Sequence, residues 1–95
     1  MKDIHPGLVA EADLRGGTYW FAPEYALAVV REAVQHGLPL LGIEGAFLGA
    51  NSTQPSLEDS WDYGTHPVAD PHRHAFGFIQ ERARKGLHFE IVLAE

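Results

Sequence analysis

Two stretches of the chain carry apolar residues at helical spacing. In 23–36 the apolar residues form one continuous stripe, which predicts a helix with a single buried face. Pro23 suits the first helical position, where its missing N–H costs nothing, and Gly37 suits the turn that ends a helix. The stretch 71–85 shows the same spacing directly after Asp70, a residue type that caps helix N-termini. The pattern therefore predicts two amphipathic helices.

Strand patterns lie before, between and after these helices. Thr18–Phe21 is short, β-branched and aromatic, and Pro39–Leu48 is the most apolar run of the chain, typical of a buried strand. Leu87–Leu93 alternates, so one side of this strand is expected in the core and the other partly in water. Asn51–Pro55 is expected to be a loop. Leu57–Tyr63 does not alternate cleanly and fits either the second strand of a hairpin or a short turn of helix.

This order of elements predicts an α+β fold formed by a single domain over 1–95. The simplest packing is a two-layer sandwich, in which two helices cover one face of a three- to four-stranded mixed sheet. Ahead of it, 8–14 carries a possible helical stripe that Gly16 and Gly17 would end. Glycines at 42, 45 and 49 predict a bulge or a close backbone approach within the apolar strand.

The negative charge of the protein is concentrated in one segment. The chain has 7 Lys and Arg against 13 Asp and Glu, which gives a net charge of −6. No Lys or Arg lies between Arg31 and Arg73, whereas that segment contains Glu32, Glu44, Glu58, Asp59, Asp62 and Asp70. A nucleic-acid partner is disfavoured because phosphates require a basic face, whereas a basic protein would be steered toward this segment. The alternative is that the acidic surface serves solubility alone.

Composition also bears on where the protein acts. The chain contains no cysteine, so it has no disulfide and no thiolate metal site, as is common in a reducing cytoplasm. The first six residues lack the apolar region of a signal peptide, and no apolar run approaches the ~20 residues of a membrane span. We therefore expect a cytoplasmic protein with no membrane partner.

The candidate partner-binding residues gather after the apolar strand, except for Glu44, which lies within it. Carboxylates beside large aromatics suit an interface, because aromatic anchors carry much of the binding energy and acids steer a basic partner. The predicted set is Glu44, Glu58, Asp59, Trp61, Asp62 and Tyr63. Trp61 has a second interpretation as a core residue that holds its loop down, and Glu44 as a solvent-facing residue of the sheet. We expect the three carboxylates at 58, 59 and 62 to be exposed, which disfavours acid–base catalysis.

Neither a catalytic set nor a cofactor site is predicted. No phosphate-binding loop, nucleophile elbow or Ser–His–Asp spacing is present, so the chain is not expected to be an enzyme. His66, His72 and His74, with Asp70, are weak candidates for a metal site. Histidines two apart diverge by about 200° around a helix, and Asp70 is needed as a cap. The alternative is a solvated, histidine-rich first helical turn, and no metal is predicted.

Several features of the chain occur together in one known family. Trp20 stands ahead of an Ala- and Leu-rich helix that ends in His36-Gly37, and the strand Leu38-Pro39-Leu40-Leu41-Gly42-Ile43-Glu44-Gly45 follows. A patch over 55–63, a second helix and a closing apolar strand come next. In this order of features, over about 18–94, the sequence resembles the immunity protein 40 family of bacterial polymorphic-toxin systems. Here Ile43-Glu44 separates the two glycines that the family has together, and the charged and aromatic residues of the patch are arranged differently.

The resemblance implies an antitoxin-like protein that binds the toxic domain of a cognate effector, such as a basic nuclease, and blocks it. Two other hypotheses stay open. The protein could be a structural or regulatory interaction domain that forms a homodimer through an exposed edge strand. It could also be a small metal-dependent enzyme that uses the histidines. Whether the chain is a monomer or a homodimer is not fixed by its sequence.

Overall fold

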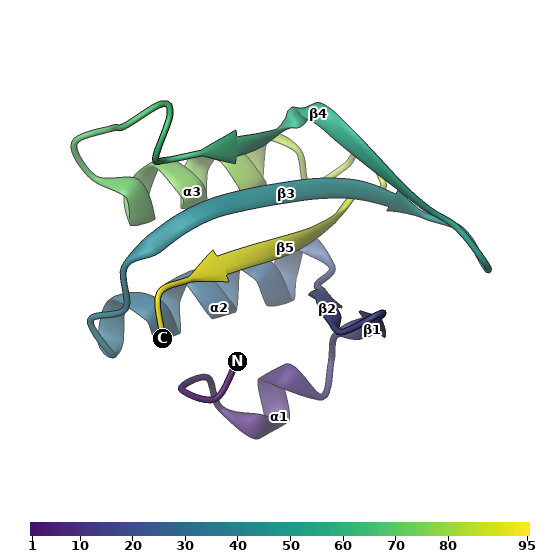
Figure 1. The fold of residues 1–95 in the computed structure, drawn as a ribbon, viewed down its shortest axis with the longest axis horizontal. Coiled ribbons are helices and arrows are strands. Elements are labelled where there is room, and N and C mark those ends of the chain that lie inside the picture. Colours follow the sequence, from purple (N-terminus) through teal and green to yellow (C-terminus); the bar gives the residue numbers. More distant parts are fainter.

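In the computed structural model, which describes all 95 residues, three strands form the larger sheet in the order β4-β3-β5 (Figure 1). β3 (Leu40–Leu48) lies at the centre, between β4 (Thr53–Asp62) and β5 (His88–Leu93). Both pairs are antiparallel, so the predicted mixed sheet is wrong in this detail. β4 is antiparallel to β3 because the turn after β3 folds the chain back as a hairpin. β4 and β5 run in the same direction, but β3 lies between them, so they do not form a parallel pair.

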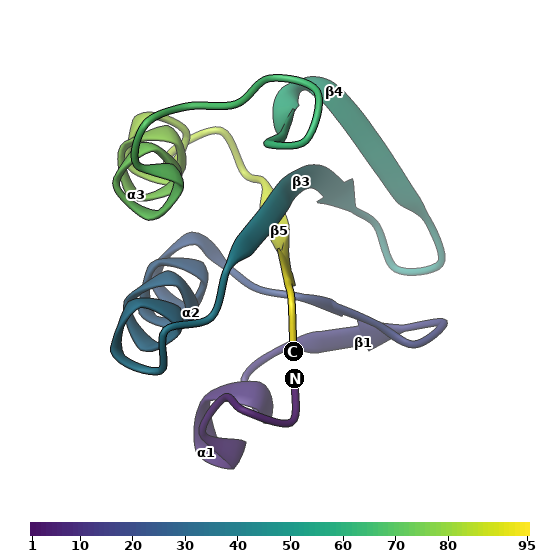
Figure 2. The same ribbon diagram turned by 60° about the vertical axis from the view of Figure 1, so that its left-hand side comes forward.

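Two helices cover one face of this sheet, as predicted (Figure 2). α2 (Pro23–Gln35) begins at its proline and is followed by Gly37, whose φ of 64° ends the helix. α3 (Pro71–Glu81) is capped by Asp70, whose carboxylate accepts the N–H of Arg73 at 3.2 Å. The α+β fold in two layers is therefore confirmed.

α3 ends before the predicted position, at Glu81. Arg82 turns back and its guanidinium donates to the carbonyl oxygen of Phe78 at 3.2 Å, so it satisfies one of the free carbonyls at the helix end. The same side chain reaches across to β4, where its Nε donates to the carboxylate of Asp59 at 3.0 Å. Gly86 then takes a φ of 81° and leads the chain into β5.

The N-terminal part adds a short helix and a second sheet. α1 (Pro6–Val9) is followed by a hairpin of β1 (Asp13–Arg15) and β2 (Thr18–Trp20). Of the predicted helical stripe over 8–14, only Leu8 and Val9 are helical, whereas Asp13 and Leu14 belong to β1. Gly16 and Gly17 do not end a helix but form the turn of the hairpin. Phe21 and Phe89 exchange two backbone hydrogen bonds of 2.8 Å, which attach this hairpin to the edge of β5.

The core lies between the helices and the sheet. Val29 of α2, Ile79 of α3 and Ile43 of β3 are almost completely buried there, together with the inward side of the last strand. Leu87, Phe89 and Ile91 make up that side, as the alternation predicted. None of the helices combines the length and the apolar content needed to cross a bilayer.

Candidate partner-binding surface

β4 contains a large bulge. Gly45 pairs with Ser56 and Ile43 pairs with Trp61, so four residues, Leu57–Ser60, stand opposite the single residue Glu44. This confirms the hairpin interpretation of the uncertain segment, although β4 already begins at Thr53, within the predicted loop. Bulges bend a strand and change the direction of its side chains, and they are frequent near functional sites.

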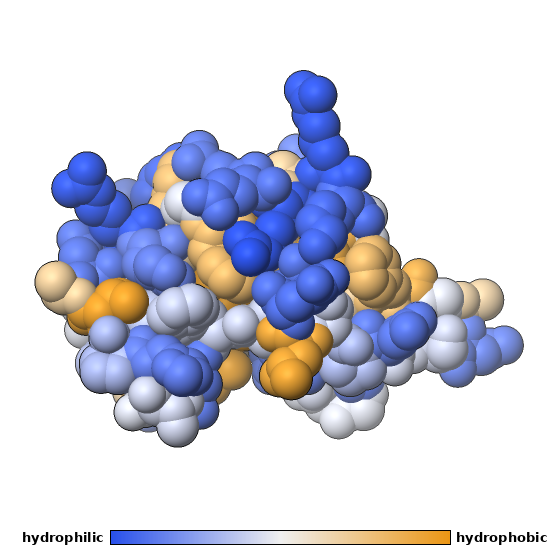
Figure 3. Space-filling view, turned by 90° about the horizontal axis from the view of Figure 1, so that it is seen from above, coloured by the Kyte–Doolittle hydropathy of each residue, from blue (hydrophilic) through white to orange (hydrophobic).

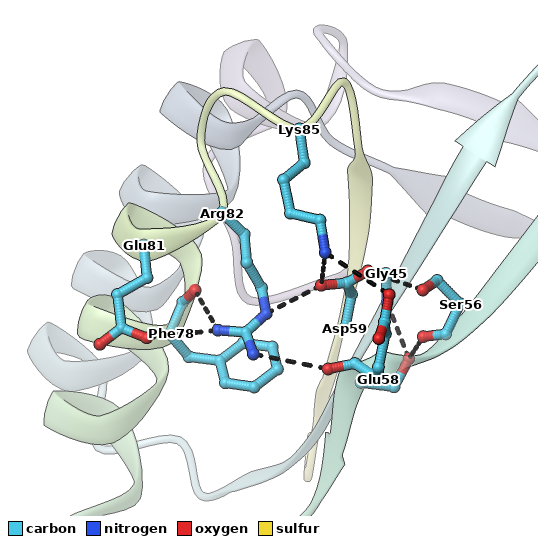
Figure 4. A network of polar contacts seen from close by, with 9 residues as sticks. Gly45, Ser56, Glu58, Asp59, Phe78, Glu81, Arg82 and Lys85 are labelled. Atoms are coloured by element: carbon cyan, nitrogen blue, oxygen red, sulfur yellow. Dashed lines mark hydrogen bonds and ion pairs between the residues drawn. The ribbon is translucent and has the colours of Figure 1, made fainter.

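A buried carboxylate fixes this bulge to the end of α3 (Figure 4). Asp59 is only 1% exposed, and its carboxylate accepts from Ser56 Oγ at 2.6 Å. It also accepts from Arg82 Nε at 3.0 Å and Lys85 Nζ at 2.7 Å. Burial raises the pKa of Asp59, but the bonds from Lys85, Ser56 and Arg82 outweigh it and hold that pKa below its ordinary value. The expected exposure of Asp59 is therefore wrong, because three donors compensate for its burial.

The aromatic residues of the predicted set connect β4 to α3. Tyr63 is 7% exposed, and its hydroxyl lies 2.9 Å from Nδ1 of His74. Burial raises the pKa of Tyr63. The ring of Trp61 lies 4.5 Å from that of His74, and its indole N–H donates to the carbonyl oxygen of His66 at 2.9 Å. Tyr63 is thus buried rather than exposed, and the contacts of half-buried Trp61 match its second interpretation, as a residue that holds the loop down.

The three candidate metal ligands are engaged in separate contacts. Nε2 of His72 lies 2.7 Å from the carbonyl oxygen of Leu38, whereas His74 contacts Tyr63. His66 packs on the edge of Trp61, with ring centroids 5.7 Å apart. No group of three His, Asp or Glu side chains is arranged to hold a metal ion.

An open groove of about 930 Å³ lies beside the bulge, where β3 and β4 diverge. Its walls carry three exposed apolar side chains: Leu57, which is 91% exposed, Leu41 at 49% and Val92 at 37%. Glu44 and Asp62 also line it, and none of the chain's Lys or Arg residues does. Figure 3 looks onto β4 and α3 from above and shows apolar residues as separate patches among hydrophilic ones. The exposed surface is thus mixed, as in many transient interfaces.

Two carboxylates face each other on the sheet surface at the edge of this groove. Glu44 of β3 pairs with Glu90 of β5 in the strand register, and neither forms an ion pair. Partial burial raises the pKa of Glu90, and the charge and the hydrogen bond of Glu44 raise it further. Like charges directly opposite each other on adjacent strands destabilise a sheet. The pair therefore costs stability, and no ion pair with a Lys or Arg of the chain compensates it.

We expect Glu90→Gln to increase the free energy of unfolding at pH 7 by about 0.5 kcal/mol, because it removes this repulsion. A raised pKa means that the folded state takes up a proton before the unfolded state does. The penalty is therefore present at neutral pH and is relieved as pH falls through the pKa of folded Glu90. Urea denaturation at pH 7 and below pH ~4.5 tests both points, since the advantage of the variant should shrink in acid. Glu11→Gln, at an exposed site, is the control, and a loss of stability in Glu90→Gln at pH 7 would contradict the assignment.

The predicted residues are therefore divided between two roles. Glu44, Glu58, Trp61 and Asp62 keep partly or fully exposed side chains, whereas Asp59 and Tyr63 are structural. The sequence interpretation missed Leu41, Leu57, Val92 and Glu90. The signal for Leu57 and Val92 was present, since each is an apolar residue at a position where the strand pattern expects a polar one.

No family model matches the sequence, and no curated protein matches it. The resemblance to the immunity protein 40 family therefore stays a prediction.

Proposed function

We propose that this protein neutralises a bacterial toxin domain by stoichiometric binding, in the manner of an immunity protein. The observation that carries the proposal is the groove in which exposed Leu57 and Leu41 are bordered by Glu44 and Asp62, without a lysine or an arginine. Such a surface favours a basic protein partner, because the acids accelerate encounter and the apolar side chains hold the complex. Following the resemblance, the proposed site of action is the cytoplasm.

The environment of the polar groups supports binding rather than catalysis. Asp59 is neutralised by Arg82 and Lys85, so it is committed to the fold. The contact between Tyr63 and His74 lies under Trp61, in a cluster that joins two elements. Glu58 and Asp62 stand exposed on an open surface, whereas general acid–base catalysis works best in a closed site that tunes a pKa.

The proposal is tested by capture followed by a growth assay. The immobilised protein is exposed to lysate from its source at moderate salt, and we expect one basic polypeptide to be retained at a one-to-one ratio. Expressed alone, that polypeptide should stop growth, and co-expression with this protein should restore it. Charge reversal at Glu44 and Asp62 should abolish both retention and rescue. A retained polypeptide that is harmless to cells would refute the toxin-inhibitor function.

Self-association is the weaker alternative. β4 is the free edge of the larger sheet, but Pro55 removes a backbone donor from it and the bulge interrupts its regular pairing. Two copies that met through the groove would also bring together two acidic surfaces. Sedimentation at high concentration should therefore show a monomer, and a stable dimer would favour the interaction-domain hypothesis.

A further inference from the structure

The uncompensated pair of Glu44 and Glu90 indicates the first feature of the partner, a basic side chain. They stand directly opposite each other on adjacent strands, so their side chains lie on the same face of the sheet. The basic side chains that do form ion pairs with acidic side chains, Arg15, Arg82 and Lys85, lie elsewhere and are already engaged with Asp13, Glu81, Asp59 and Glu58. A guanidinium or ammonium group placed between two carboxylates would remove their repulsion and form charge-assisted hydrogen bonds to both.

The bulge indicates the second feature of the partner, an apolar side chain that contacts Leu57. Leu57 is 91% exposed, and it stands two residues before Asp59, which is fixed by Arg82 and Lys85. The Oγ of Ser60 accepts the N–H of Gly45 at 3.1 Å and donates to the carbonyl oxygen of Ser56 at 2.8 Å, so the bulge is closed on both sides. An apolar side chain is therefore held in water on an anchored segment, and anchoring lowers the entropic cost of binding through it.

We infer that the groove receives an apolar side chain of a partner protein against Leu57 and Leu41, next to an arginine or lysine that lies between Glu44 and Glu90. This inference rests on the proposed function only in assuming a protein partner. Charge complementarity selects that partner: a nucleic-acid backbone would be repelled by these acids, and a second copy of the chain would present the same acids to them. Asp62 also lines the groove and accepts the N–H of Gly64 at 2.8 Å. This hydrogen bond holds the pKa of Asp62 below its ordinary value, so Asp62 is ionised at pH 7 and adds to the negative field.

The test uses a synthetic peptide with Arg-Leu-Arg at its centre and the ¹⁵N-labelled protein. We expect amide shifts on titration to cluster at 41–44, 57–62 and 90–92. A peptide with citrulline in place of both arginines keeps the shape but loses the charge, and it should bind about tenfold more weakly or worse. Replacing the central leucine by serine should have a similar effect. A second open groove is lined by residues of α2 and α3, among them Val34 and Phe76, and shifts centred there would overturn the inference.

Protein variants distinguish peptide binding at this site from nonspecific attraction of a basic peptide to an acidic protein. The double variant Glu44→Gln/Glu90→Gln should weaken peptide binding about tenfold or more, whereas Glu11→Gln/Glu24→Gln removes the same charge elsewhere and should have little effect. Leu57→Ser should weaken binding without lowering Tm, and Leu14→Ser, at an exposed position of β1, is its control. Equal losses of peptide affinity in both double variants would show that net charge alone explains the binding, and would overturn the inference.

The two proposals fail in different ways. A captured toxin whose affinity is unchanged by Glu44→Gln/Glu90→Gln and by Leu57→Ser overturns the inference and leaves the proposed function intact. Peptide binding in the groove, combined with a captured polypeptide that is harmless to cells, removes the toxin-inhibitor function and leaves the inference intact.

Discussion

Asp59→Ala is expected to lower the free energy of unfolding by about 3 kcal/mol. Removing one partner of a buried ion pair leaves the other charge without compensation, which costs about 3–5 kcal/mol when both partners are buried. Arg82 and Lys85 are 21% and 43% exposed, so water compensates them in part and the lower end of that range applies. Ser56 would also lose the acceptor of its hydroxyl. Urea denaturation at pH 7 measures the change.

The control is Glu58→Gln on the neighbouring residue. Glu58 contacts the same Lys85 at 3.8 Å, but its side chain is 82% exposed. Exposed ion pairs contribute roughly 0–1 kcal/mol, so this variant should remain close to the wild type. A loss of less than about 1 kcal/mol in Asp59→Ala would show that the carboxylate does not hold the bulge.

Asp59 should also affect how the stability of the protein changes with falling pH. Because the folded state lowers the pKa of Asp59, its contribution is complete above the unfolded value of about 3.9 and is lost as pH falls through the folded pKa. The wild type should therefore lose stability on acidification below about pH 4, and Asp59→Asn should lose less over the same interval. A pH series of denaturation midpoints for both proteins checks this.

The parts of the fold that the sequence predicted well depend on local signals. The start of α3 follows from Asp70 and Pro71, and the inward face of β5 follows from the alternation of Leu87, Phe89 and Ile91. Capping and periodicity act within a few residues, so they can be read without knowing the fold. The end of α3 is different, because it is set by contacts of Arg82 with a strand 23 residues earlier in the chain.

The candidate site was harder to predict for the same reason. Asp59 lies in a polar stretch and has no local feature that distinguishes it from exposed Glu58 or Asp62. Its burial depends on Arg82 and Lys85, and the residue pattern of β4 does not indicate these contacts. The opposition of Glu44 and Glu90 likewise depends on the register between β3 and β5. One hint was correct: Gly45 was expected to mark a bulge or a close backbone approach, and the bulge stands beside it.

Gly45→Ala should therefore lower the free energy of unfolding by about 2 kcal/mol, in the range typical of overpacking. A Cβ at this position would collide with the backbone carbonyl oxygen of Asp59 and lie 3.1 Å from its Cβ. Neither group can move easily, because Asp59 is held by Arg82 and Lys85 and the N–H of Gly45 is bonded to Ser60. Urea denaturation at pH 7 measures this loss.

Gly77→Ala provides a matched control with the opposite sign. Nothing lies within 4 Å of a Cβ built at Gly77, and the residue lies inside α3. Alanine there should stabilise the protein by about 0.5–1 kcal/mol, because it favours the helix without a clash. If Gly45→Ala were as stable as the wild type, the bulge would have to be mobile enough to move away. A mobile bulge would not hold Leu57 in place, so this one measurement also tests the anchoring on which partner binding through Leu57 depends.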